Sequence, residues 1–132
     1  MVKLSDSDLK KLKSAHPDLV RIIMEYCRIS IIPIKIHEVK RDMTTQLANI
    51  KKGVSWTTRS RHLPSKDGLC RAVDAVPIDE KGNPIWAWPI YYKLAPIMKQ
   101  AAKNVKIPIE WGGDWKKSKD GPHWQLPWKF YP

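Results

Sequence analysis

The sequence predicts an α+β fold in which helices pack on a small, mostly antiparallel sheet. Apolar residues recur at helical spacing near the start of the chain and again after residue 90. Short segments rich in β-branched and aromatic residues lie between and beyond these helices, and turn-forming residues separate them. The chain has 132 residues without an internal repeat or linker, so residues 1–132 are expected to form a single domain around one core.

Two helices and a strand are predicted at the start of the chain. Ser5, with Asp8 three residues later, gives the capping-box pattern of a helix N-terminus. Pro17 suits the first turn of a second helix, whose apolar residues keep helical spacing up to Arg28. Between residues 32 and 36 isoleucines alternate with other residues, which is typical of a half-buried strand.

The middle of the chain is predicted to contain a helix, a long loop and a strand. The helix is expected to open at Thr44 or Thr45 and to close at Gly53. Residues 54–71 show no periodicity, and a loop of this length suggests a function. Residues 72–76 have the composition of a buried strand.

The last part of the chain is predicted to hold a hairpin, a helix and two further strands. The turn-forming run 79–84 indicates that residues 85–88 pair with the strand before it. A helix is expected from about residue 90 to Asn104, with Pro96 either kinking it or marking its first turn. The remaining elements are a strand, a glycine turn and a short strand, at residues 107–111, 112–113 and 123–126.

The formal net charge of +11 indicates a polyanionic partner, such as nucleic acid, an anionic membrane or an acidic wall polymer. Basic residues are spread along the chain and never exceed two in a row, so no sequence-specific nucleic-acid binding is expected. No segment reaches the ~18 apolar residues of a membrane span, and the first residues lack the apolar core of a signal peptide. We therefore expect a cytoplasmic location, with Cys27 and Cys70 as reduced thiols.

Four histidines are available for a metal site. His16 lies at a helix start and His37 at a strand end, so both are expected to have ordinary structural roles. His62 and His123 lie in polar surroundings with carboxylates nearby, and are the better candidates. Two histidines and one carboxylate would leave an open position for water, as a catalytic zinc ion requires.

Two aspartates are candidates to complete such a site. Asp74 lies among apolar strand residues, where a carboxylate is costly unless it is paired or metal-bound. Asp120 precedes His123 by three residues, so one of the pair could bind a metal while the other lies over its water.

Four segments carry a more specific pattern: Ser60-Arg61-His62, Ala72-Val73-Asp74, the run from Ile109 to Trp115, and the run from Asp120 to Leu126. Together they resemble the zinc D-alanyl-D-alanine carboxypeptidase family, above all its bacteriophage L-alanyl-D-glutamate endopeptidases. The segment from Glu38 to Arg41 is similar to the one in which this family places an arginine facing the substrate.

The resemblance implies a role for each of six residues. Zn²⁺ would be held by His62, Asp74 and His123, with Asp120 as general base, Arg41 as transition-state stabiliser and Ser60 in a lesser supporting role. The loop between His62 and Asp74 holds eleven residues and is longer than is usual in the family, which makes Asp67 a rival ligand. Asp74 is preferred because of its strand context.

Tryptophans are expected to lie mostly in the core. Those in strand-like segments are predicted core residues: Trp86, Trp88 and Trp111. Those near the candidate site could line a groove for glycan or peptide: Trp115, Trp124 and Trp128.

The implied function is that of an endolysin, which cleaves the L-alanyl-D-glutamate bond of the peptidoglycan stem peptide and lyses the host cell. We expect a monomer with one catalytic domain and no separate wall-binding domain. It would remain in the host cytoplasm until lysis releases it to the periplasm, where its charge would attract it to anionic envelope polymers.

Two alternatives remain open. A D-Ala-D-Ala carboxypeptidase or dipeptidase would use the same metal site. A basic nucleic-acid-binding protein would have no catalytic activity, and the charge alone supports it. Bound zinc would separate this last alternative from both peptidases.

Overall fold

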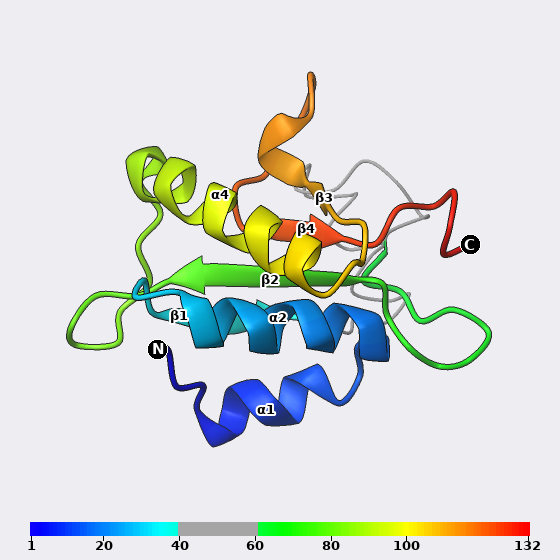
Figure 1. Cartoon of the computed structure of the whole chain (residues 1–132), viewed down its shortest axis with the longest axis horizontal. Coiled ribbons are helices and arrows are strands. Elements are labelled where there is room, and N and C mark those ends of the chain that lie inside the picture. The colour runs from blue at the N-terminus through cyan, green and yellow to red at the C-terminus, as the bar shows by residue number, and fades with distance from the viewer. Residues whose placement is uncertain (40–60) are drawn as a thin grey trace, which may run out of the picture.

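The computed structural model describes residues 1–39 and 61–132, which form helices on a four-stranded sheet (Figure 1). The strands follow the order β1-β2-β4-β3, and each neighbouring pair is antiparallel. The predicted α+β class is therefore confirmed. In chain order the elements are α1 (Asp6–Leu12), α2 (Pro17–Ile29), β1 (Ile34–Glu38), β2 (Ala72–Pro77), α4 (Trp88–Asn104), β3 (Glu110–Trp111), the 3₁₀ helix η1 (Gly112–Asp114) and β4 (His123–Gln125).

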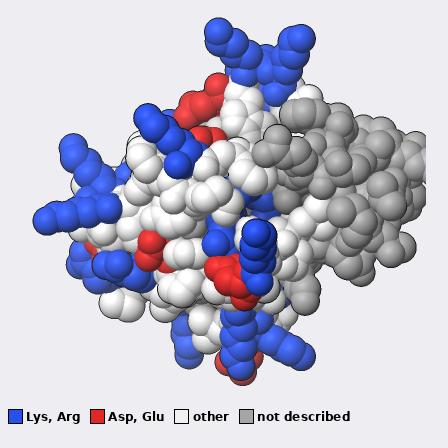
Figure 2. Space-filling view, turned by 90° about the vertical axis from the view of Figure 1, so that its right-hand side faces the viewer, with Lys and Arg blue, Asp and Glu red and all other residues white. Residues whose placement is uncertain are grey.

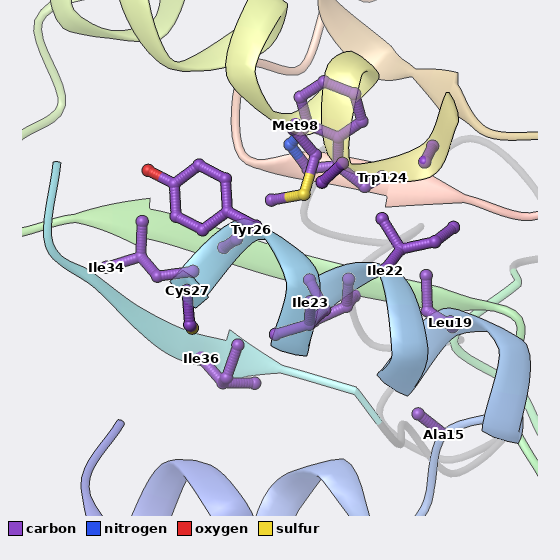
Figure 3. Packing of buried hydrophobic residues seen from close by; sticks show 14 of the residues in the cluster. Ala15, Leu19, Ile22, Ile23, Tyr26, Cys27, Ile34, Ile36, Met98 and Trp124 are labelled. Carbon is purple, nitrogen blue, oxygen red and sulfur yellow. The ribbon is translucent and has the colours of Figure 1, made fainter. Parts of the chain in front are cut away.

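The core lies between the sheet and the pair of helices α2 and α4, which run side by side across one face (Figure 1). In Figure 3, side chains of α2 point towards Met98 of α4 and Trp124 of β4. Val73 and Trp124 belong to this core, whereas their chain neighbours Asp74 and His123 project to the opposite face, because successive strand residues alternate. The sheet thus separates an apolar face from a polar one.

The first two helices begin as their sequences predict. The Ser5 hydroxyl accepts a hydrogen bond from the Asp8 N–H at 3.1 Å, and the Asp8 carboxylate accepts one from the Ser5 N–H at 3.0 Å. Asp8 also accepts from the Ile36 N–H at 2.8 Å, which ties α1 to β1. At the start of α2, Nδ1 of His16 accepts from the Asp18 N–H at 3.0 Å, so the structural role expected for His16 is confirmed.

The hairpin predicted after β2 forms only in part: Pro84 makes an antiparallel bridge with Ile78, and the Ile85 N–H donates to the Pro77 carbonyl at 2.8 Å, but the pairing stops there. Residues 85–87 form no strand, and α4 begins at Trp88 with Pro89 in its first turn. Proline favours this position because its fixed φ suits a helix and its missing N–H needs no partner there. Pro96 consequently lies inside α4 and does not mark its first turn.

The core prediction for the first two tryptophans is wrong. Trp86 is 54% exposed and Trp88 is 36% exposed, and among the described residues no strand runs alongside residues 85–87. Trp111 is buried as predicted, and its ring stacks on that of Trp124 at 5.7 Å between centroids. Trp124 is fully buried in the core and so lines no groove.

The strand predicted over residues 107–111 is shorter than expected. Pairing begins only at Glu110, because Pro108 has no N–H to donate and Lys106 takes a left-handed conformation with φ of 59°. The predicted turn at Gly112 and Gly113 forms the 3₁₀ helix η1. The helix predicted from Thr44 or Thr45 to Gly53 lies outside the described residues.

Within residues 1–39 and 61–132, no helix combines the length and the apolar character needed to cross a membrane. Cys27 and Cys70 are both buried and form no disulfide, in agreement with the predicted thiols.

Candidate metal centre

The pairing of β2 with β4 brings a carboxylate and an imidazole together on the polar face of the sheet. Asp74 and His123 are direct cross-strand partners, so their side chains project to the same side. Oδ1 of Asp74 lies 3.5 Å from Nδ1 of His123. The pairing of the two strands is thus sufficient to place the Asp74 carboxylate beside the His123 ring.

A second imidazole reaches Asp74 from the loop before β2. Nε2 of His62 lies 3.2 Å from Oδ1 of Asp74, and the two imidazole rings meet edge to face at 5.1 Å. The Cys70 thiol donates to the His62 carbonyl at 3.1 Å, which ties the backbone of His62 to a residue two positions before β2. One possible ligand atom from each of His62, Asp74 and His123 lies within 4.8 Å of the others.

The environment of Asp74 favours a cation. All three residues are buried, with exposed fractions of 2% for His62, 9% for Asp74 and 6% for His123. Within the described part of the chain, Oδ1 of Asp74 has no hydrogen-bond partner although solvent does not reach it. A buried carboxylate oxygen in this state is costly, and a metal ion between the two imidazoles would satisfy it.

The protonation state of the carboxylate also suits a metal ligand set, whereas a metal ion would have to displace a proton from His62. Burial alone would raise the pKa of Asp74, but the neighbouring His123 and His62 hold it well below its usual range. Burial alone would lower the pKa of His62, but the Asp74 carboxylate outweighs this effect and raises it. Asp74 is therefore an anion at neutral pH, as metal binding requires.

Each histidine has a partner on the ring nitrogen that faces away from Asp74. Nδ1 of His62 lies 2.9 Å from the Val39 carbonyl, which can only accept, so His62 Nδ1 carries the proton. Nε2 of His123 lies 2.7 Å from Oε1 of Gln125. The nitrogens facing Asp74 are thus Nε2 of His62 and Nδ1 of His123, and a metal could bind both.

Asp120 lies in the loop that leads into β4. Its N–H donates to the Gly112 carbonyl at 3.1 Å, and its own carbonyl accepts from the His123 N–H at 3.3 Å. A side chain at position 112 would overlap the Asp120 carbonyl oxygen, so the loop needs glycine there. Burial raises the pKa of Tyr91 to about 12, and the charges of Asp120 and Asp74 contribute to this rise. The Asp120 carboxylate therefore lies within electrostatic range of the same tyrosine as Asp74.

Several predicted residues lie apart from the centre or outside the described chain. Asp67 forms a two-pronged ion pair with Arg71, at 2.7 and 2.9 Å, which lowers the pKa of Asp67 to about 2. His37 lies in β1 with its ring edge-on to Trp86 at 5.7 Å. Arg41 and Ser60 lie outside the described residues.

Two residues near the centre received no role from the sequence. Gln125 contacts His123, and Glu110 contacts Gln125. The signal that could have found Gln125 is its spacing, since a residue two positions after His123 on the same strand shares its face. Of the three tryptophans expected beside the site, Trp115 packs on the His123 ring at 5.0 Å, Trp128 packs on the Arg61 guanidinium, and Trp124 is buried in the core.

The chain is similar to known proteins over nearly its whole length. Residues 1–125 match the family model described as phage L-alanyl-D-glutamate peptidase. The chain is 31% identical over 126 residues to the L-alanyl-D-glutamate peptidase of Listeria phage A118, a match that covers 95% of this chain but 41% of that protein. The crystal structure of the Serratia marcescens L-Ala D-Glu endopeptidase ChiX is similar with a TM-score of 0.87 and 38% identity, and the match covers 100% of this chain and 94% of that one.

Proposed function

Because the chain belongs to the phage L-alanyl-D-glutamate peptidase family, we propose that it is a zinc-dependent endopeptidase of peptidoglycan stem peptides. The bond cut would be that between L-alanine and D-glutamate, as the names of both similar proteins suggest. The observation that carries the proposal is the buried oxygen of Asp74, which lies between two imidazole nitrogens without a hydrogen-bond donor among the described residues.

The three side chains fit zinc by their chemistry. Two neutral imidazoles and one carboxylate form a three-ligand set that leaves one position for water or substrate. When bound there by His62, Asp74 and His123, zinc would supply Lewis acidity and would lower the pKa of water towards ~7.

The remaining chemistry would fall to residues of the chain. Asp120 would accept the proton of the attacking water and return it to the leaving amine, as a general base and then a general acid. The contacts of its backbone with Gly112 and His123 support this role, because they hold the aspartate beside the proposed ligand. Arg41 would offset the charge that develops on the scissile carbonyl oxygen, with Ser60 in support.

The proposal includes where the enzyme acts. We propose that residues 1–132 fold as one catalytic domain, that it works as a monomer, and that it passes from the host cytoplasm to the periplasm when the cell lyses. The net charge of +11 supports attraction to anionic envelope polymers. In Figure 2 the lysine and arginine side chains form several separate groups on the visible face, which suits diffuse attraction rather than a sequence-reading nucleic-acid site.

The test is digestion of purified sacculi by the zinc-loaded protein, read by mass spectrometry. The proposal expects fragments that begin with D-glutamate and glycan that ends in L-alanine, with neither product formed by His123→Ala. Release of D-alanine alone would establish a carboxypeptidase instead. A folded protein that binds no zinc and leaves sacculi intact would favour the nucleic-acid-binding alternative.

A further inference from the structure

Two side chains extend from the candidate metal centre along the polar face of the sheet. Gln125 follows His123 by two residues in β4, and both residues are 6% exposed. Oε1 of Gln125 lies 2.7 Å from Nε2 of His123. The amide Nε2 of Gln125 donates to Oε2 of Glu110 at 3.2 Å, and Glu110 is the cross-strand partner of Gln125 in β3.

The order of donors and acceptors in this row has only one consistent solution. A carboxylate of Glu110 can only accept, so the amide NH₂ of Gln125 must face it. The amide oxygen of Gln125 then faces His123, and since this oxygen can only accept, Nε2 of His123 must carry the proton. Nδ1 of His123 is left with its lone pair towards Asp74, 3.5 Å away.

We propose that Gln125 is a positioning residue that fixes the tautomer and ring orientation of His123, and that Glu110 fixes the orientation of the Gln125 amide. The role of Glu110 follows from the symmetry of an amide, which can rotate and present either its oxygen or its NH₂. With the NH₂ towards His123, Nε2 would have to accept, the proton would move to Nδ1, and the nitrogen facing Asp74 could no longer bind a metal.

His62 needs no such second residue. Its Nδ1 donates to the backbone carbonyl of Val39 at 2.9 Å, and a carbonyl cannot reverse its polarity. The two proposed ligands would therefore use opposite nitrogens, Nε2 of His62 and Nδ1 of His123, and only His123 would depend on a side chain for this choice. Outer partners of this kind typically change metal affinity by about 10–100-fold.

This inference rests on the metal site of the proposed function, so its experiment reads two quantities. The first is the tautomer of His123 in the metal-free protein, from long-range ¹H–¹⁵N spectra recorded above the ordinary imidazole pKa of about 6.5. The second is zinc affinity, from competition with a chelator. The variants are Gln125→Met, Glu110→Gln, and the double exchange Glu110→Gln with Gln125→Glu, with Gln100→Met on the exposed surface of α4 as the matched control.

The inference expects the wild type to hold His123 protonated on Nε2. Gln125→Met should give a mixture of tautomers and weaken zinc binding by about 10–100-fold, and Glu110→Gln should have the same effect to a smaller degree. The double exchange should restore most of both properties, because a carboxylate at 125 accepts from His123 while an amide at 110 donates to it. Glu110 is exposed, so Glu110→Gln should fold and still test the proposal if Gln125→Met does not fold.

A wild-type tautomer and wild-type zinc affinity in a folded Gln125→Met protein would overturn the inference and leave the proposed function intact. So would failure of the double exchange to recover affinity above that of Glu110→Gln. A protein that binds no zinc, yet loses the Nε2 tautomer in Gln125→Met, would keep the positioning role and reject the zinc enzyme.

Discussion

The candidate centre joins two regions that are built in different ways. Asp74 and His123 belong to paired strands, so the hydrogen-bond register of the sheet sets their separation. His62 belongs to a loop and is held by separate contacts. The Cys70 thiol donates to its carbonyl, its Nδ1 faces the Val39 carbonyl, and the neighbouring Arg61 is bonded to the Leu126 carbonyl. Two paired strands cannot shift by a small amount, because a slip of one residue turns each side chain to the other face of the sheet. The strand region therefore supplies precision, and the loop region depends on many separate contacts.

Arg61 shows how far the support of the loop region extends. Its guanidinium is buried and donates to the Leu126 carbonyl at 3.1 Å and to the Tyr131 carbonyl, and it stacks on Trp128 at 3.7 Å. Tyr131 in turn donates to the Asp18 carboxylate at 2.7 Å. Arg61, the residue that precedes His62, thus links this candidate ligand to the last residues of the chain.

The division into a precise strand region and a supported loop region would be wrong if the loop supplied the metal-binding carboxylate. We expect Asp74→Ala to abolish stoichiometric zinc binding and all activity, because it removes the anion between the two imidazoles. Asp67→Ala is the matched control and should keep its zinc, since Asp67 is paired with Arg71. Elemental analysis after dialysis measures both. Zinc retained by Asp74→Ala and lost from Asp67→Ala would transfer the ligand to the loop.

A smaller but still large effect is expected at Asp120, which lies beside the strand region. Asp120→Ala should keep zinc and fold while turnover falls at least about a hundredfold, the scale of a lost general base. Asp114→Ala removes an aspartate that bonds Lys99 at the surface, and should leave turnover unchanged. Turnover on a soluble stem peptide at equal zinc content is the measurement. Equal rates for Asp120→Ala and the wild type would remove Asp120 from the mechanism.

The loop region should respond to a change far from the metal. Arg61→Met keeps much of the side-chain length but leaves two carbonyls without their donor, which should cost about 1–3 kcal/mol in the free energy of unfolding. Zinc affinity should fall as well, because His62 is the next residue. Arg28→Met at the exposed surface of α2 is the control, because Arg28 pairs only at the surface, with Glu25. Denaturant unfolding with and without zinc tests this, and an unchanged free energy would show that the loop does not depend on the C-terminal contacts.

The smallest effect concerns the surface rather than the centre. Added salt should weaken lysis of outer-membrane-stripped cells more than cleavage of a soluble stem peptide. The attraction due to a charge of +11 is screened over ~8 Å at physiological ionic strength, whereas chemistry in a buried centre is screened less. Initial rates for both substrates across a salt series give the comparison. Equal sensitivity would mean that the net charge has no targeting role.

The difference between local and long-range contacts explains which features the sequence could predict. The capping box at Ser5 and the strand around Asp74 depend on local residue patterns, and both were predictable. The contact of Gln125 with Glu110 depends on which strands pair, and no local pattern records that pairing. The hairpin predicted at residues 85–88 shows the converse, because it stops after its first bridge, where the helix start favoured by Pro89 takes over residues that have the composition of a strand. Asp67 pairs with Arg71, and this contact had no part in the sequence-based preference for Asp74.

The central claim is that one metal ion binds where the two regions meet. Anomalous diffraction from crystals of the zinc-loaded protein tests it most directly. The account predicts a single zinc peak at about 2.0–2.2 Å from Nε2 of His62, a carboxylate oxygen of Asp74 and Nδ1 of His123, with a fourth position open to solvent. A zinc ion bound through Nε2 of His123, or bound at Asp67 with Asp74 empty, would contradict it.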